Sequence, residues 1–289
     1  MRNHILVTGA TGTVGAEVVR ILARRGAPVL AAARDPARFA APEGRSVEIR
    51  TFDFEKPETW DAAFQEVRKL FLIRPPALSK VRQVFQPLLD AARQAGVEHV
   101  VFLSLLGAEK SLWVPHRRIE RAIERSGMRW TFLRPGFFMQ NLSTTHLEDI
   151  RDDDEIFVPA GKGKTSFVDA RDLAEISALA LTQPGFHSRA FPLTGPEALD
   201  YYEVAAIFGE VLGRPITYPE PSDLAFFRRM RKRGHPIGFI AVMIGIYATC
   251  RFGMSGRVTK DAATLLGRPP RSVRQFVEDF RDLWTRPEA

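Results

Sequence analysis

The sequence predicts an α/β fold: a Rossmann-type doubly wound parallel sheet with a smaller, mostly helical lobe near the C-terminus. Two observations predict this fold. Apolar, β-branched runs alternate with segments of helical periodicity through the first half of the chain, and a glycine-rich turn joins the first strand to the first helix. We predict a sheet domain over residues 1–150, with 165–195 returning to the sheet, and a helical substrate-binding lobe over 196–289.

The chain begins with a single βαβ unit, made of a strand at 4–8, a helix at 16–25 and a second strand at 28–33. The turn between the first strand and the helix has the spacing G-x-x-G-x-x-G. In a dinucleotide site, such glycines permit a tight turn, close approach to a pyrophosphate and close helix–strand packing. The phosphate then lies on free N–H groups at the helix N-terminus. We therefore predict dinucleotide binding, rather than a purely structural turn, by Gly9, Thr11, Gly12, Thr13, Val14 and Gly15.

The end of the second strand indicates which dinucleotide is preferred. An NAD site places an acidic residue there to bind the ribose 2′-hydroxyl, whereas this chain has Arg34 first and Asp35 second. A guanidinium can bind a 2′-phosphate through two hydrogen bonds, which favours NADPH. The alternative is that Asp35 binds the ribose and Arg34 is a solvated surface charge.

The remaining elements follow the same alternation. Strands are predicted at 46–52, 69–73, 99–103, 129–133, 165–168 and 190–194, and helices at 57–67, 78–95, 113–126 and 170–181. Beyond residue 200 we predict helices at 201–213, 222–233, 236–252, 259–266 and 272–285. The stretch 237–250 is almost wholly apolar but too short to span a bilayer, so a buried helix lining an apolar pocket is favoured over a membrane anchor.

Composition narrows the class of protein. The chain has 289 residues, a formal net charge of +7 and a single cysteine, Cys250, which excludes an intrachain disulfide and a cysteine-based zinc cluster. No metal site is expected. The first strand starts almost at residue 1, so we expect no signal peptide and a cytoplasmic location. The chain is expected to be a monomer or homodimer.

Two charged runs stand out in the second half. The acidic run 152–155 is expected to be a solvated turn. The basic cluster 228–233 is expected to be a solvated helix face, with a docking surface as the alternative. Because no nucleic-acid-binding motif accompanies the basic cluster, no nucleic-acid partner is expected.

In a parallel sheet, ligands bind beyond the carboxyl ends of the strands. We expect Asp53 and Phe54 near the adenine. The residues expected around the nicotinamide and substrate also lie at strand ends, and they are Ile73, Arg74, Pro75, Ser104, Pro135 and Phe137.

Several motifs resemble one known family. They are residues 8–15, the Arg34-Asp35-Pro36 turn, Ser104, the run 131–141 (TFLRPGFFMQN), residues 168–169, 193–196 and the closing segment 266–271. Together they are similar to the atypical short-chain dehydrogenase/reductases, and most similar to the NmrA-like branch. The resemblance implies an NADP-binding oxidoreductase. That branch includes NADPH-dependent quinone, azo-dye and triphenylmethane-dye reductases, and also catalytically silent redox sensors.

The chain departs from the wider superfamily at the catalytic pair. The usual Tyr-x-x-x-Lys is missing, because all four tyrosines lie at residue 201 or beyond. His116 and Glu120 stand in its place, one helical turn apart, and the resemblance implies that such replacements are typical of NmrA-like reductases. His116 is a candidate proton donor whose pKa Glu120 would raise, or else only a contact to substrate or cofactor. Ser104 is a candidate hydrogen-bond donor to the substrate, or else a cap.

Without the Tyr/Lys pair, the chemistry favours an acceptor that delocalises the incoming charge, such as a quinone, azo, iminium or conjugated carbonyl compound. Apolar and aromatic residues would suit such a flat substrate, although each could simply be core. The candidates for substrate contact are Phe137, Phe138, Asn141, Phe227, Met243 and Tyr247. We therefore predict an NADPH-dependent reductase, with a non-catalytic NADP(H)-binding redox sensor as the alternative.

Overall fold

The computed structural model describes residues 3–39, 41, 47–75, 78, 80–110 and 114–286. The chain forms two compact units, which are described separately. The sheet unit comprises Met1–Pro135 and Ala170–Leu193, and the helical unit comprises Gly136–Asp169 and Thr194–Ala289.

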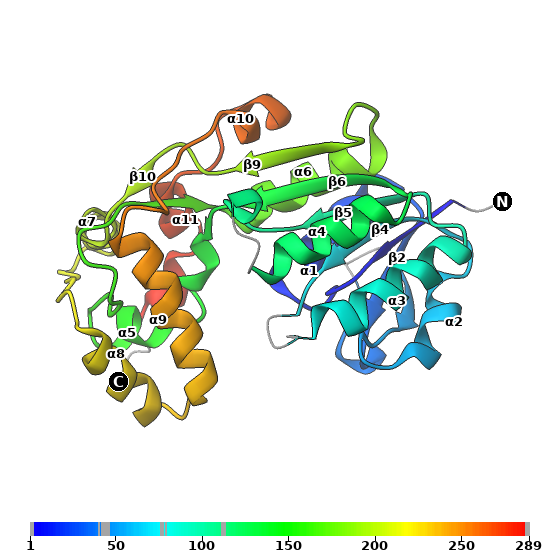
Figure 1. Ribbon diagram of the computed structural model, residues 1–289. Coiled ribbons are helices and arrows are strands. Elements are labelled where there is room, and N and C mark those ends of the chain that lie inside the picture. The colour runs from blue at the N-terminus through cyan, green and yellow to red at the C-terminus, as the bar shows by residue number, and fades with distance from the viewer. Residues whose placement is uncertain are drawn as a thin grey trace. The chain divides into compact units, whose positions relative to one another are not determined.

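The sheet unit contains a seven-stranded parallel sheet of order β3-β2-β1-β4-β5-β6-β9 (Figure 1). Its strands are β1 (His4–Val7), β2 (Val29–Ala33), β3 (Glu48–Thr51), β4 (Val67–Ile73), β5 (His99–Leu103), β6 (Arg129–Pro135) and β9 (Arg189–Leu193). Strands β1, β2 and β5 are buried along their whole length, as the unbroken apolar runs predict. The order reverses direction at β1, which is the hallmark of a doubly wound sheet. The predicted fold class is confirmed.

Helices cover both faces of this sheet (Figure 1). They are α1 (Thr13–Arg24), α2 (Trp60–Phe64), α3 (Val81–Gln94), α4 (Pro115–Arg125) and α6 (Ala170–Thr182). Helix α1 packs against α6, while α3 packs against α2 and α4. The predicted helix 57–67 is shorter than expected, because Glu66 adopts a positive φ of 59° and β4 begins directly after it. Residues 46 and 113, at which a strand and a helix were predicted to begin, lie outside the described residues.

The helical unit has its own three-stranded sheet of order β10-β8-β7, made of β7 (Phe137–Phe138), β8 (Thr165–Val168) and β10 (Ala198–Leu199). Residues 165–195 were expected to return to the large sheet. Helix α6 and strand β9 do so, whereas β8 pairs with β7 and β10. Two glycines permit this arrangement: a Cβ built on Gly136 or Gly195 would lie 2.4 Å from a backbone oxygen of β8.

The helices of this unit are α5 (Leu147–Asp152), α7 (Tyr201–Leu212), α8 (Asp223–Lys232), α9 (Ile237–Arg251), α10 (Asp261–Leu266) and α11 (Val273–Asp279). Their core is rich in aromatic side chains. Within the described part of the chain, no helix combines the length and the apolar character that a bilayer crossing requires.

Helix α9 corrects one expectation. Ile240, Met243, Tyr247 and Cys250 form its buried face, at the spacing of a helix stripe. The opposite face is also apolar but exposed, with Ile237 60% and Val242 61% accessible. The prediction of a buried helix is therefore wrong for half of its surface, because apolar residues all round the helix concealed which face packs.

Candidate active site

The glycine turn after β1 has the geometry that its spacing predicts. Gly9 has a φ of +65°, which suits glycine best, and its carbonyl oxygen accepts a hydrogen bond of 2.9 Å from the Gly12 N–H. A Cβ built on Gly15 would lie 2.2 Å from that same oxygen, so α1 approaches the turn as closely as only glycine allows. Gly9 and Gly15 therefore shape the turn itself.

The other residues of the turn form an open cradle at the N-terminus of α1. Thr11, Gly12 and Thr13 are exposed, and a Cβ on Gly12 would meet only the Gly9 oxygen, at 3.4 Å. The first N–H groups of a helix have no partner within it. The Val14 side chain is buried, so Val14 can contribute only its backbone N–H. This cradle fits a pyrophosphate.

Arg34 and Asp35 have different surroundings after β2. The Asp35 carboxylate accepts a hydrogen bond of 3.1 Å from the Ala37 N–H and caps a short 3-10 helix, Pro36–Arg38. The Arg34 side chain is exposed, and it has no hydrogen-bond or ion-pair partner among the residues that the structure describes. The capping role of Asp35 leaves Arg34 as the better candidate for a cofactor contact.

The end of β4 lies beside the glycine turn. A Cβ built on Gly9 would be 3.5 Å from Ile73, and the Thr8 hydroxyl accepts a hydrogen bond of 2.9 Å from the Ile73 N–H. Arg74 donates to the carbonyl oxygens of Pro75 and Leu78, at 3.2 and 2.9 Å. The structure thus brings Ile73 to the cradle, and Arg74 holds the segment that follows.

At the end of β3, Asp53 and Phe54 serve partly structural roles. The Asp53 carboxylate accepts from the Glu55 N–H at 3.0 Å. The Phe54 ring is buried against Phe52 and Phe85, with ring centroids 4.9 and 5.6 Å away. The Phe54 side chain therefore belongs to the core of the sheet unit, and an adenine contact by either residue stays a prediction.

Ser104 and Glu120 meet in a buried network at the ends of β5 and β6. The Ser104 hydroxyl donates to Glu120 Oε1 at 2.7 Å. Arg134 donates through Nε and Nη2 to the two Glu120 oxygens, both at 2.9 Å, and Arg117 Nη1 donates to Oε2 at 3.0 Å. Glu120 itself is fully buried. Four hydrogen bonds therefore fix its carboxylate.

This network keeps Glu120 ionised. Burial alone would raise its pKa, but the hydrogen bonds from Arg134 and Ser104 and the positive charge of Arg134 outweigh burial, so the pKa is lowered. Arg134 and Arg117 were not among the predicted site residues. The signal was available for Arg134, because β5 and β6 are adjacent with Leu103 opposite Leu133, which places residues 104 and 134 side by side.

The pKa of His116 is shifted in the opposite direction to the one predicted. Burial lowers its pKa to about 4, and the nearby Arg74 charge lowers it further than Glu120 raises it. The expectation of a pKa raised by Glu120 is therefore wrong, since desolvation and a cation dominate. The imidazole is stacked with Phe102 at a centroid distance of 6.1 Å and is neutral near pH 7.

The candidate substrate residues all belong to the helical unit. Phe137 follows Pro135, the last residue of β6, by two positions, and its ring lies 5.8 Å from those of Phe167 and Tyr247. Tyr247 is fully buried, with its hydroxyl hydrogen-bonded to His146. The other four range from buried to half-buried: Met243 is buried, whereas Phe138, Asn141 and Phe227 are half-buried. The structure thus groups Phe137 and Tyr247 in one aromatic cluster.

The fold and the cradle define a dinucleotide-binding α/β protein. The profile of the NmrA-like family matches residues 1–251, and the chain belongs to that family.

Similar proteins include several reductases. The chain is 36% identical to an NAD(P)H azoreductase of Xenophilus azovorans over 280 residues, which cover 95% of this chain and 96% of the relative. The structure of Citrobacter sp. triphenylmethane reductase complexed with NADP(H) matches with a TM-score of 0.84 and 26% identity, covering 96% of this chain and 99% of that one. The NADPH complex of an Escherichia coli NADPH-dependent quinone oxidoreductase matches with a TM-score of 0.86 and 25% identity, over the same shares of the two chains.

Proposed function

We propose that this protein transfers a hydride from NADPH to a flat, electron-poor organic acceptor such as a quinone, an azo compound, an iminium ion or a conjugated carbonyl compound. The class, an NAD(P)H-dependent oxidoreductase, follows from the family and from its reductase relatives. The choice of acceptor rests on the chemistry of the residues at the ends of β5 and β6.

The proposal rests on the protonation of Ser104 and His116, the two candidate proton donors to a substrate. The Ser104 hydroxyl gives its hydrogen to the Glu120 carboxylate, so it has none to offer an alkoxide. His116 is neutral near pH 7, because its pKa is about 4. Reduction of a simple ketone needs an acid for the developing alkoxide, and neither residue supplies one readily. An acceptor that spreads the charge over its own π-system does not need that help.

The chain's own residues would then bind and orient. The free N–H groups of Thr13 and Val14 at the start of α1 hold the pyrophosphate, and the Arg34 guanidinium holds the 2′-phosphate. NADPH, when bound, supplies the hydride. The network around Glu120 fixes the ends of β5 and β6 as a rigid floor, and His116 contacts the ligands as a neutral imidazole. The reduced acceptor takes its proton from water.

The test follows NADPH oxidation at its absorbance band with quinones, azo dyes and simple ketones, with NADH run in parallel. We expect turnover of quinones or dyes and none of ketones. Turnover of ketones at comparable rates would contradict the proposal that the site lacks a proton donor. Tight NADPH binding without oxidation by any acceptor would instead support the redox sensor.

A variant pair tests the role of His116. A general acid contributes about 10²- to 10⁴-fold to a rate. We expect His116→Asn to change KM but to lower kcat less than tenfold, with an unchanged pH profile from pH 6 to 8. Arg118→Ala, at an exposed position of the same helix, is the control. A hundredfold loss of kcat in His116→Asn alone would make His116 the proton donor.

A further inference from the structure

The turn between α8 and α9 lies at one end of the helical unit (Figure 1), and the exposed residues Ile237, Phe239 and Val242 beside it form an apolar tip. Three successive residues of the first turn of α9, Ile237, Gly238 and Phe239, are all exposed, although side chains 100° apart would not all face outward on a packed helix. Ile237 is 60% and Phe239 39% accessible, and Val242 on the next turn is 61% accessible. Large apolar side chains gathered at one exposed tip mark an interaction surface.

The exposed face of α9 carries no charge. No charged residue occurs between residues 237 and 250. Gly238 and Gly245 lie on this face, and a Cβ built on either would meet no atom within 4 Å. The His235 ring stacks on Phe239 at a centroid distance of 5.2 Å, whereas Ile237 and Val242 stay mostly exposed in the described part of the unit.

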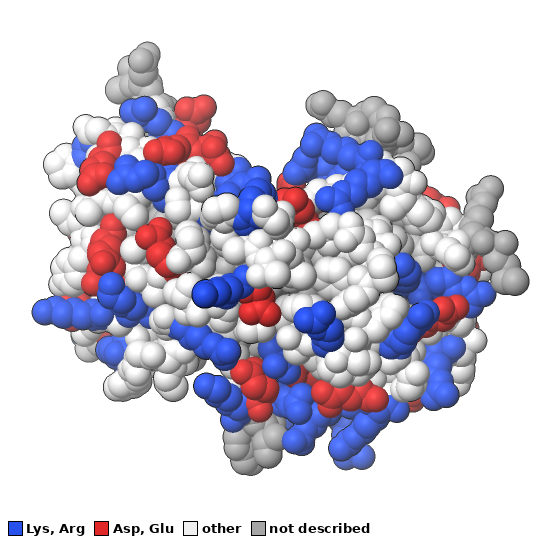
Figure 2. Space-filling view, turned by 90° about the horizontal axis from the view of Figure 1, so that it is seen from above, with Lys and Arg blue, Asp and Glu red and all other residues white. Residues whose placement is uncertain are grey.

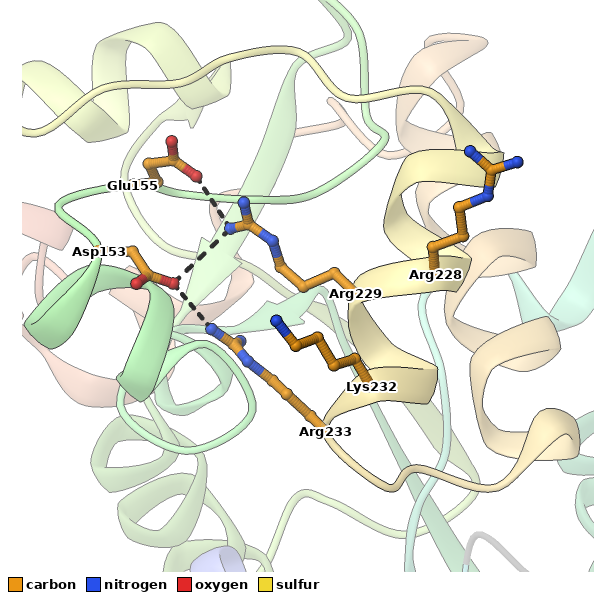
Figure 3. A pocket seen from close by; sticks show the side chains of 6 residues that line it. All are labelled: Asp153, Glu155, Arg228, Arg229, Lys232 and Arg233. Atoms are coloured by element: carbon orange, nitrogen blue, oxygen red, sulfur yellow. Dashed lines mark hydrogen bonds and ion pairs between the residues drawn. The ribbon is translucent and has the colours of Figure 1, made fainter.

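Part of the neighbouring basic cluster is neutralised within the unit (Figure 3). Arg229 pairs with Asp149 at 3.1 Å and with Glu155 at 2.9 Å, and its guanidinium lies over the Phe157 ring. Arg233 pairs with Asp149 at 2.8 Å and Asp153 at 3.0 Å. In the acidic run 152–155, Asp152 and Asp153 are exposed, as a solvated turn predicts, but Asp153 and Glu155 also pair with these two arginines, which we did not expect. These two arginines fix α8 to the rest of the unit.

The other three cations of α8 remain at the surface. Arg228, Arg231 and Lys232 are exposed, and none has a carboxylate partner among the described residues. Arg228 points away from the charged pocket, whereas Lys232 extends along its edge beside Arg229 and Arg233 (Figure 3). Arg231 donates to the His235 carbonyl oxygen at 2.7 Å, which holds its side chain at the turn. Elsewhere, on the face shown in Figure 2, basic and acidic side chains intermingle. The α8–α9 turn thus combines unpaired cations with exposed apolar residues.

We propose that this turn docks on an anionic lipid surface. Arg228, Arg231 and Lys232 would contact lipid phosphates, while Ile237, Phe239 and Val242 enter the boundary between headgroups and acyl chains. Charge complementarity favours this occupant over a second copy of the chain, because a two-fold contact at the tip would bring like cations together. In this mode of docking the turn lies in the headgroup region of the membrane and does not cross the bilayer. The inference is independent of the proposed function.

The test is co-sedimentation of the full-length protein with vesicles. Vesicles of phosphatidylcholine alone are compared with vesicles containing about 30% phosphatidylglycerol, in about 0.1 M salt. We expect binding to the anionic vesicles only. Each basic residue near an anionic surface contributes about a fivefold factor in partitioning. Arg231→Glu/Lys232→Glu should therefore weaken binding at least about 25-fold.

Two controls separate docking from general attraction by the net charge of +7. Lys110→Glu/Lys162→Glu changes the net charge equally at two exposed lysines that belong to other segments of the chain and should weaken binding less than threefold. Ile237→Asp should reduce binding at least tenfold, whereas Leu283→Asp, at a site 43% accessible, should not. Equal effects of tip and control variants would overturn the proposal. Self-association without vesicles that Ile237→Asp abolishes would also overturn it, in favour of a dimer contact.

Discussion

Replacing Glu120 by glutamine tests the network at the ends of β5 and β6. Glu120 is fully buried and faces Arg134, whose side chain is only 13% accessible. Removing one partner of a buried ion pair costs about 3–5 kcal/mol, since the other charge stays buried without compensation. Arg134 still pairs with Glu109, at 3.3 Å, after Glu120 is replaced. The expected cost of Glu120→Gln therefore lies near the lower end of this range, at about 3 kcal/mol.

The assay is thermal and denaturant unfolding followed by circular dichroism, with hydrogen exchange of α4 and β6 to locate the loss. A cost of 3 kcal/mol lowers the melting temperature by about 6–12 °C in a protein unit of this size. The matched control is Glu98→Gln. Glu98 pairs with Arg129 at 2.6 Å, but both side chains are about half exposed, at 53% and 51%, so about 0–1 kcal/mol is expected.

The pH dependence gives a second readout for Glu120. Its pKa is lowered in the folded state, so its ionisation stabilises the fold above the carboxyl's usual value, near 4.5, and that stability is lost as the pH falls through the folded pKa. The gap between wild type and Glu120→Gln should therefore close in acid. A Glu120→Gln variant that loses no more stability than Glu98→Gln at pH 7 would refute the reasoning.

Three further predictions concern the cofactor and acid stability. Gly12→Asp should weaken NADPH binding at least about a hundredfold in a fluorescence titration, because its carboxylate would occupy the phosphate cradle; a melting temperature lowered by more than a few degrees would mean that the fold is damaged instead. Arg34→Ala should weaken NADPH about 10- to 100-fold and NADH less than threefold, and equal losses would refute the 2′-phosphate contact. Burial, with nearby positive charges, lowers the pKa of His99 to about 3. As the pH falls, His99 is therefore protonated in the unfolded state before it is protonated in the folded state. The free energy of unfolding should then fall by about 1.4 kcal/mol per pH unit between about pH 6.5 and 3. His99→Gln should flatten this slope in acid unfolding curves, and an unchanged slope would contradict the assignment.

The sequence was most informative where a local pattern has one physical solution. The spacing of Gly9, Gly12 and Gly15 predicts a tight turn and close packing of the helix against it; in the structure Gly9 turns the chain with a positive φ, and Gly15 lets α1 approach the turn closely. The unbroken apolar runs of the strands likewise predict burial on both faces. These features depend on neighbours within a few residues, so periodicity and spacing suffice to predict them.

The site at Glu120 depended on contacts between distant segments. Helical spacing correctly places His116 and Glu120 one turn apart, and it suggested that they act on each other. In the fold, Ser104 and Arg134 reach Glu120 from two adjacent strands and determine its ionisation, while Arg74 and burial determine that of His116. A pKa depends on every charge and on the solvent around a group, and spacing along one helix describes only a part of these.

Helix α9 shows the opposite difficulty. Its residues are apolar all round, so the hydrophobic pattern contains no information about which side packs. Only the tertiary structure separates the buried stripe at Met243 and Tyr247 from the exposed face at Ile237 and Val242. In an amphipathic helix, charged residues show which face is exposed. Here the charged residues lie on the preceding helix, at Arg231 and its neighbours. The exposed surface is therefore formed by cations of α8 together with apolar residues of α9. A search for amphipathic patterns within single helices would therefore miss the turn, because its two components belong to different helices.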